Sequence, residues 1–302
     1  MAPGQGRSKE IIMFVIAGIT GQTGGAAAGA LLAAGHRVRA FVRDPSRAAA
    51  WAARGVEVVA GDIADAASLE RALAGAQGAY LLAPPQPAHP DPVGSYVAVA
   101  QAVRTAVQRA GLERLVFLSS EGAHLPAGTG PIRGLHRAEE ILAGAAPRLT
   151  FLRAAYFQDN WRAVLDLAAA QGILPTMLGS PERKRAMVAT ADIGRVAADL
   201  LTGGGAPAIV ELSGPQDYSA EDAAAAMSAA LGRPVKAVEP PREAWTGILR
   251  DAGVGAAFAD LLAEMYDGIA GGQIGFSGEG EARRGATTLG ETVAGWVRAK
   301  AA

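Results

Sequence analysis

The feature that most constrains the fold lies near the N-terminus, where an apolar run at positions 11–17 leads directly into regularly spaced glycines. Gly18, Gly21 and Gly24 form the pattern G-x-x-G-x-x-G, and an alanine-rich helical segment follows. Glycine at this spacing permits a tight turn, a close approach of a pyrophosphate to the backbone, and close packing of the helix against the strand. The start of such a helix presents free amide groups and a positive dipole end to an anion. The stretch therefore predicts a strand, turn and helix that bind a dinucleotide, completed by a second strand at 36–42.

The residue that ends this second strand indicates which dinucleotide is preferred. A site for NAD usually carries an acidic residue here, which binds the ribose 2′-hydroxyl, whereas this chain has Arg43. A guanidinium suits a 2′-phosphate by its charge and its forked donors. We therefore expect NADP(H), with NAD(H) possible, and assistance from Arg47. Two other interpretations stay open: the adjacent Asp44 takes the acidic role, or Arg43 is only solvated.

The composition favours a globular chain without cysteine chemistry. Hydrophobic residues make up 50% of the 302 positions, enough to bury the core of one large α/β domain or two unequal lobes. The absence of cysteine excludes disulfides and thiolate sites, and the histidines lack metal-ligand spacing, so no metal site is expected. The net charge of −1 gives no general attraction to nucleic acid or to an anionic membrane, and the basic run 183–185 is interpreted as a solvated loop. We expect a cytoplasmic protein with neither nucleic acid nor membrane as a partner.

The chain alternates short apolar runs with helical segments. After the first two strands, further strands are predicted at 56–60, 78–83, 115–118 and 149–153. This alternation predicts an α/β fold with a Rossmann doubly wound parallel sheet. From about residue 160 the alternation loosens, which indicates a smaller α+β substrate lobe. We therefore divide the chain into disordered residues 1–10, an NAD(P)-binding domain at 11–155, and a substrate lobe at 156–302, with strand and helix exchange between the two.

Three later helices have predicted N-terminal caps. Thr190 is placed as the cap of one helix, and Ser219 as the cap of the next. Thr288 and Glu291 have the spacing of a capping box, which predicts a last helix that ends near Trp296.

Residues at the carboxyl ends of the strands are candidates for nucleotide binding, because open parallel sheets place their ligands there. Asp62 follows the third strand and either accepts a hydrogen bond from the adenine amino group or, like Asp65, caps the next helix; the sequence favours neither. The residues expected to contact the nucleotide are Gly18, Thr20, Gly21, Gln22, Thr23, Gly24, Arg43, Asp62, Ile63, Leu82, Ala83, Pro84, Ser119, Tyr156 and Phe157.

Polar and aromatic side chains after two later strands are candidates for substrate binding. Two serines follow the fifth strand, a loop at 121–134 is either a lid or a long connection, and a polar and aromatic cluster occupies 154–161. The expected substrate contacts are Pro85, Ser120, His136, Phe157, Asn160 and Trp161. The candidate catalytic groups, as weak proton donors or orienting groups, are His136, Ser120 and Tyr156.

Together these segments resemble the NmrA-like atypical short-chain dehydrogenase/reductase family, from about residue 11 to 297. The run 152–160, Leu-Arg-Ala-Ala-Tyr-Phe-Gln-Asp-Asn, resembles a family signature, and 191–194, Ala-Asp-Ile-Gly, resembles the family's helix start. The chain looks most like the branch of type-two NADPH:quinone oxidoreductases and azo- and triphenylmethane-dye reductases. This resemblance implies a Rossmann domain, NADPH, and hydride transfer to a flat electron-poor acceptor.

The chain departs from related families at two positions that serve acid catalysis. The extended short-chain enzymes use Tyr with Lys four residues later, and none of the five tyrosines here has that partner. The isoflavone-reductase-like branch has a lysine on the helix near 134–143, where this chain has Leu135, followed by His136. Reactions that need a proton at one defined atom are therefore less favoured.

The expected activity is NADPH-dependent reduction of an electron-poor aromatic acceptor of the quinone, azo or triphenylmethane type. Such acceptors need little acid catalysis, so proximity and orientation in a water-poor cleft suffice. Two other functions stay open: a non-catalytic NADP(H)-sensing regulator of the NmrA type, and a biosynthetic ketone or imine reductase with His136 as the acid. A small aromatic substrate is the expected partner, and both monomer and homodimer are consistent with the sequence.

Overall fold

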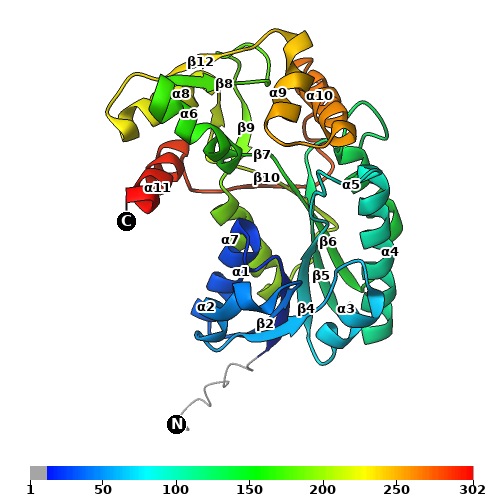
Figure 1. Ribbon diagram of the computed structural model, residues 1–302. Helices are drawn as coiled ribbons and strands as arrows, with labels where there is room; N and C mark the ends of the chain where they lie inside the picture. Colours follow the sequence, from blue (N-terminus) through cyan, green and yellow to red (C-terminus); the bar gives the residue numbers. More distant parts are fainter. Residues whose placement is uncertain (1–11, 302) are drawn as a thin grey trace.

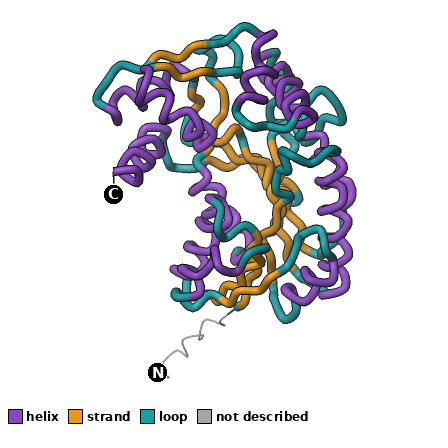
Figure 2. The backbone as a smooth tube through the Cα atoms, viewed as in Figure 1, coloured by secondary structure: helices purple, strands orange, loops and turns teal. Residues whose placement is uncertain are grey.

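The central element of the fold is an eight-stranded sheet in which every neighbouring pair is parallel (Figures 1 and 2). The computed structural model describes residues 12–301, so the predicted disorder of residues 1–10 lies outside the described range. The strand order is β3-β2-β1-β4-β5-β6-β10-β13. From β1 the chain adds strands toward one edge as far as β3 and then, from β4 on, toward the other edge, so the order of the strands reverses between β1 and β4. The strands are β1 (Met13–Ala17), β2 (Arg37–Val42), β3 (Glu57–Ala60), β4 (Gly78–Leu82), β5 (Arg114–Ser120), β6 (Arg148–Ala154), β10 (Ile209–Ser213) and β13 (Glu281–Arg284). The predicted Rossmann topology is confirmed.

Helices cover both faces of this sheet, because each face is apolar and must be buried. One face packs against α1 (Gln22–Ala33) and α7 (Thr190–Thr202), and the short helix α2 (Ala49–Ala52) lies near them. The other face packs against α3 (Ala66–Leu73), α4 (Pro92–Ala110) and α5 (Ile132–Leu142). Within residues 12–301, no helix has both the length and the apolar character needed to cross a membrane.

A smaller lobe follows β6 and lies beyond the carboxyl edge of the sheet, in the upper part of Figure 1. Its strands are β7 (Tyr156–Phe157), β9 (Arg185–Val188) and β11 (Asp217–Tyr218) in one sheet, and β8 (Ile173–Pro175) and β12 (Lys236–Val238) in another. Its helices are α6 (Leu165–Gln171), α8 (Ala220–Leu231), α9 (Trp245–Asp251), α10 (Ala256–Ala270) and α11 (Leu289–Ala301). Helix α7 and strands β10 and β13 come from the same half of the chain but lie with the main sheet. The chain therefore passes between the two parts more than once.

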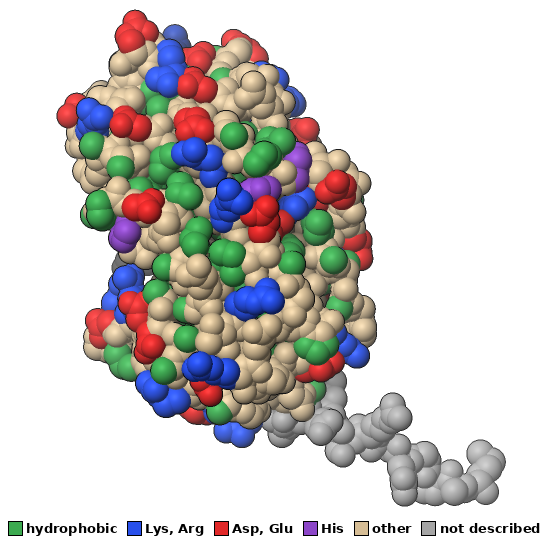
Figure 3. Space-filling view, turned by 90° about the vertical axis from the view of Figure 1, so that its right-hand side faces the viewer, with side chains coloured by type: hydrophobic (Ala, Val, Ile, Leu, Met, Phe, Trp, Pro, Cys, Tyr) green, Lys and Arg blue, Asp and Glu red, His purple; other side chains and the backbone are tan. Residues whose placement is uncertain are grey.

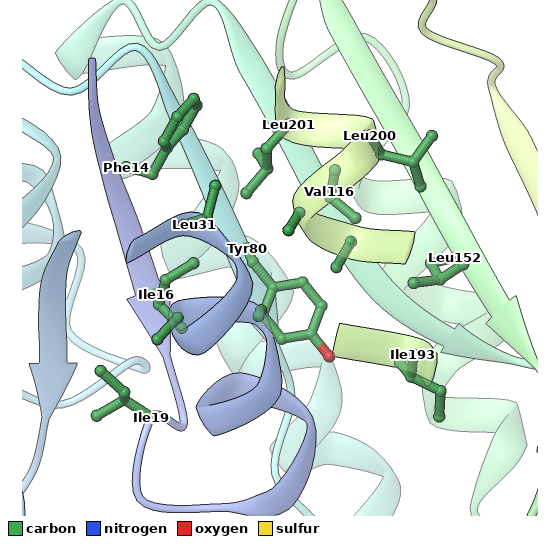
Figure 4. Packing of buried hydrophobic residues seen from close by; sticks show 14 of the residues in the cluster. Phe14, Ile16, Ile19, Leu31, Tyr80, Val116, Leu152, Ile193, Leu200 and Leu201 are labelled. Atoms are coloured by element: carbon green, nitrogen blue, oxygen red, sulfur yellow. The ribbon is translucent and has the colours of Figure 1, made fainter. Parts of the chain in front are cut away.

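Helices α1 and α7 cross at very short distance, and a glycine makes this possible. A methyl group at Gly194 would lie 2.4 Å from the Ala26 Cβ and 2.5 Å from the Ala27 amide nitrogen. Below this crossing the fully buried Tyr80 from β4 packs with Leu31 and Ile193 (Figure 4). The crossing thus holds the helix that follows the glycine turn in a fixed position on the sheet.

The structure confirms two of the predicted caps and corrects the third. Ser219 forms a reciprocal capping box at the start of α8, and Thr288 exchanges hydrogen bonds with Glu291 at the start of α11. Thr190 is wrong as a cap: it is the first residue of α7, and its amide donates to Asp159 Oδ2 at 2.9 Å. A carboxylate from 31 positions away in the sequence replaces the local hydroxyl.

The crossing of α1 and α7 predicts a specific stability effect. Gly194→Ala should lower the free energy of unfolding by about 1–3 kcal/mol, because the added methyl group must push the two helices apart. Gly29→Ala is the matched control: it adds the same group to α1 where nothing lies within 4 Å, and should be neutral or stabilise by up to about 1 kcal/mol. Urea unfolding of both variants measures the difference. Equal stabilities would contradict the tight crossing.

Candidate active site

The glycine turn between β1 and α1 forms the floor of the candidate site. Gly18 has a φ of +68°, a conformation that side chains disfavour, and its carbonyl accepts a 2.8 Å hydrogen bond from the Gly21 amide. A Cβ at Gly24 would lie 2.3 Å from the Gly18 carbonyl oxygen, so only glycine fits. Helix α1 starts without a side-chain cap and without an acidic residue in its first turn. Its free amide groups are therefore available to an anion.

A first cavity, of about 420 Å³, opens at the carboxyl ends of β1, β2 and β3. Arg43 and Arg47 supply cations to its wall, and Asp62 supplies a carboxylate. The complete lining is Ala17, Gly18, Thr20, Phe41, Val42, Arg43, Asp44, Arg47, Gly61, Asp62, Ile63, Leu82, Pro84 and Gln86.

The acidic groups near Arg43 have local structural roles. Asp44 accepts hydrogen bonds from the Ser46 amide and hydroxyl, and these bonds hold its pKa below the usual value. Asp65 caps α3 by accepting from two amides, whereas Asp62 accepts from the Ala64 amide and lies in the cavity wall. For Arg43, the part of the chain from 12 to 301 shows no hydrogen bond or ion pair, so its guanidinium is available to a ligand.

A second cavity, of about 450 Å³, continues from the first. The two share Gly18, Thr20, Leu82 and Pro84, so together they form one cleft across the point where the strand order reverses. Ligands of open parallel sheets bind at such a reversal. The complete lining is Gly18, Thr20, Gly21, Gln22, Thr23, Leu82, Ala83, Pro84, Pro85, Tyr96, Leu118, Ser119, Ser120, Leu135, Phe157 and Thr190.

Most of the predicted nucleotide contacts line this cleft, with two exceptions. Gly24 lies behind the turn, where it packs against the Gly18 carbonyl. Tyr156 and Phe157 are neighbours in β7, where successive side chains alternate in direction. Phe157 lines the second cavity, whereas Tyr156 packs into the small lobe with its ring 6.1 Å from that of Trp161.

The predicted substrate contacts divide in the same way. Pro85, Ser120 and Phe157 line the second cavity. His136 lies outside the lining, with its Nδ1 2.8 Å from the Ala123 carbonyl oxygen. Trp161 is buried and Asn160 is exposed, and neither lines the cavity. All of these role assignments stay predictions.

Sequence reasoning missed several residues of the cleft. Tyr96, Leu118 and Thr190 line the second cavity, and Gln86 and Phe41 line the first. Thr190 has the residue type and position of a helix cap, and Tyr96 lies on a helix whose sequence pattern does not distinguish core residues from cleft residues. Leu135, which stands where a related branch has a lysine, also lines the second cavity.

A buried ion pair holds the end of β5 in place. Arg153 donates to both oxygens of Glu139, at 3.0 and 2.6 Å, and Ser119 Oγ donates to Glu139 Oε1 at 2.5 Å. The side chains of the pair are 5% and 10% exposed. Arg153 also donates to Ser277 Oγ at 3.2 Å. The hydroxyl proton of Ser119 is therefore already used inside the protein.

Glu121 is a buried carboxyl that follows β5 and turns away from the cleft. It lines a separate cavity of about 240 Å³ with Arg185, whose guanidinium lies 3.6 Å away. The Tyr156 amide donates to it at 3.1 Å. Burial raises the pKa of Glu121 to about 7; Arg185 and the Tyr156 amide oppose the shift, and the nearby Asp217 adds to it.

The Glu139–Arg153 pair gives one testable prediction. Glu139→Gln should lower the free energy of unfolding by about 3 kcal/mol, because it removes the carboxylate that is hydrogen-bonded to the buried Arg153. Glu140→Gln makes the same change one position along α5, in an exposed pair with Arg137, and should cost at most about 1 kcal/mol. Chemical denaturation measures the free energy of unfolding of both variants. Equal losses would show that the buried pair stabilises the fold no more than the exposed pair does.

Glu121 gives a second prediction, on pH. Its folded-state pKa lies above the unfolded value, so the folded state binds more protons between about pH 4.5 and pH 7. The contribution of Glu121 to the free energy of unfolding is therefore complete below about pH 4.5. It is lost as the pH rises to about 7, by up to about 3 kcal/mol. Glu121→Gln should remove this decline, as measured by denaturation at several pH values. An unchanged slope in the variant would exclude Glu121 as its source.

Comparisons with known proteins identify the family and relatives of this chain. The model of the NmrA-like family matches residues 8–269. The NAD(P)H azoreductase of Xenophilus azovorans is 29% identical, over 84% of this chain and 86% of its own length. A (4-alkanoyl-5-oxo-2,5-dihydrofuran-3-yl)methyl phosphate reductase of Streptomyces griseus is 31% identical, over 85% and 83%. Quinone oxidoreductase 2 of Escherichia coli is 27% identical, over 86% and 89%.

Among solved structures, the triphenylmethane reductase of Citrobacter sp. is similar, with a TM-score of 0.77 and 25% identity, over 95% of this chain and 100% of that one. These likenesses confirm the predicted family and support the predicted class of NAD(P)H-dependent reductase. The family model covers most of the chain and the Streptomyces relative aligns over 260 residues, so this chain belongs to the NmrA-like family.

Proposed function

We propose that the chain is an NADPH-dependent reductase that transfers a hydride to an electron-poor conjugated acceptor of the quinone, azo or triphenylmethane type. The observation that carries this proposal is the cleft itself: it offers two arginines, Arg43 and Arg47, beyond β2 and is largely apolar beyond β4 and β5. A dinucleotide with an extra phosphate fits the first part, and a flat aromatic acceptor fits the second.

The nucleotide end of the cleft suits NADPH, which when bound supplies the hydride. The glycine turn and the uncapped start of α1 bind the pyrophosphate through backbone amides. Arg43 and Arg47 bind the 2′-phosphate, because both line this cavity and a guanidinium suits a phosphate by its charge and its forked donors. Asp62 accepts a hydrogen bond from the adenine amino group.

The acceptor end has walls of Leu82, Pro85, Leu118, Leu135 and Phe157. Apolar walls exclude water and hold a flat ring near the reactive carbon of the cofactor, so catalysis comes mainly from proximity and orientation. Figure 3 shows that, on the face it presents, hydrophobic side chains lie in several small groups among lysine, arginine, aspartate and glutamate side chains.

The lack of charged side chains among the described residues at this end also favours strongly electrophilic acceptors. Among the described residues that line the second cavity, there is no lysine, histidine or carboxylate. An acceptor that needs a strong acid at one defined atom is poorly served. The names of the relatives agree, since azo compounds, quinones and triphenylmethane dyes all accept two electrons into a conjugated system.

The first test is oxidation of NADPH by the purified chain, followed by its absorbance. The panel contains a quinone, an azo dye, a triphenylmethane dye and an alkanoyl-dihydrofuranone phosphate, the last because of the Streptomyces relative. Turnover with NADPH preferred over NADH is the expected result. Equal binding of oxidised and reduced nucleotide without turnover would contradict the proposal and favour a sensor.

The role proposed for Arg43 predicts a change in cofactor preference. Arg43→Gln should lower kcat/KM for NADPH by about tenfold to a hundredfold and leave NADH nearly unchanged, because only the 2′-phosphate loses a charged partner. Arg37→Gln is the matched control: it removes the same charge from the opposite end of β2. Equal effects of the two variants on NADPH would indicate general electrostatics rather than a phosphate contact.

A further inference from the structure

Tyr96 is the feature of the acceptor end that the proposed function leaves unused. It is the fifth residue of α4 and lines the second cavity together with Ser120, Pro85 and Leu135. Among the described residues that line this cavity, it is the one ionisable side chain.

The ring of Tyr96 is held rigidly. It is 6% exposed and packs into the core on the α4 and α5 face of the sheet. Gly134 of α5 lies directly against it, and a Cβ there would come within 2.6 Å of the ring atoms Cγ and Cδ2. A group fixed in this way loses little entropy when it binds a ligand.

The hydroxyl of Tyr96 is free to act on a ligand. Within residues 12–301 it has no hydrogen-bond partner. Polar side-chain atoms that lack a partner and are also fully enclosed include the Tyr80 hydroxyl but not that of Tyr96, so the Tyr96 hydroxyl is not fully enclosed. The Tyr80 hydroxyl, in contrast, is fully enclosed and lies in the core. The Tyr96 hydroxyl therefore keeps access to the cavity that its residue lines.

Two of the neighbouring polar groups, Ser119 and His136, are held by other partners in the protein. Ser119 donates its proton to Glu139, and His136 lies against the Ala123 carbonyl outside the lining. Besides Tyr96, only Ser120 offers a hydroxyl without an internal partner near the end of β5, among the residues that the structure describes.

We propose that the Tyr96 hydroxyl donates a hydrogen bond to the heteroatom of the acceptor, a quinone oxygen or an azo nitrogen, and so selects acceptors that gain negative charge there. This proposal rests on the proposed function. A quinone that receives a hydride, with its two electrons, becomes a hydroquinone anion, while NADPH becomes NADP⁺. The anion then takes one proton from water. A fixed donor aimed at the developing charge lowers the barrier.

Tyr96 is a hydrogen-bond donor in this scheme and not the source of the proton. Burial raises its pKa to about 12, whereas an unperturbed phenol titrates near 10. Proton transfer from Tyr96 to a hydroquinone anion is therefore unfavourable, and the side chain stays neutral across the working pH range.

The scheme distinguishes two classes of acceptor. A cationic triphenylmethane dye takes the hydride at its central carbon and becomes a neutral product, so no heteroatom gains negative charge. Such a dye needs no donor at the Tyr96 position, which makes it an internal control for cofactor binding and hydride supply.

Tyr96→Phe tests the proposal with benzoquinone and malachite green as acceptors. We expect kcat/KM for the quinone to fall by about tenfold to a hundredfold and that for the dye to stay within about twofold. Tyr218→Phe removes a phenol hydroxyl from the small lobe, where it accepts from the Leu289 amide, and should alter neither rate.

The possible outcomes separate this proposal from the proposed function. Equal losses with both acceptors, or no loss with the quinone, would overturn the role of Tyr96 while the reductase stands. A wild-type chain that reduces neither acceptor would overturn the proposed function and this proposal with it. Thermal unfolding and NADPH binding of Tyr96→Phe check that the fold is intact, and it should be, because the removed hydroxyl has no hydrogen-bond partner among residues 12–301.

Discussion

The close approach of α1 to its neighbours is the constraint on which the rest of the structure depends. Gly24 lets the helix lie against the end of β1, and Gly194 lets α7 cross it almost backbone to backbone. The uncapped N-terminus of α1 is thereby fixed at the point where the sheet order reverses. The proposed anion site consists of backbone amides, so the packing of α1 sets the positions of the groups that would bind the anion.

The same crossing connects the cleft to the rest of the chain. Asp192, two residues before Gly194, accepts from the Thr287 amide at 2.9 Å and so ties the segment between β13 and α11 to the start of α7. A Cβ at Gly285 would lie 2.4 Å from the Asp192 carboxylate, which explains a glycine there. Asp159 binds the first amide of α7 from the small lobe. The Asp-Ile-Gly motif thus joins the lobes as well as starting a helix.

The charges of the protein are distributed so that the acceptor end stays nearly neutral. The buried pair of Arg153 and Glu139 lies behind Ser119, and Glu121 turns into a different cavity with Arg185. The groups left at the surface of the acceptor end are apolar walls and hydroxyls. Under the proposed function, such a surface favours an acceptor that is already a strong electrophile, and the proposed hydrogen bond from Tyr96 would distinguish one class of acceptor from another.

The sequence by itself determined the strand, turn and helix at residues 12–33, the Rossmann order and the cation at the end of β2, because these depend on local periodicity and on backbone conformations that few residues adopt. Only the tertiary structure decided which side chains enter the cleft. Tyr156 and Phe157 are adjacent yet face opposite ways, and Thr190 lost its capping role to Asp159. The sequence pattern of α4 does not distinguish Tyr96 from a core residue; its place in the cleft depends on the packing of α5 against its ring. Side-chain direction at the end of a strand or helix depends on packing between segments far apart in the chain, and local patterns do not contain that information.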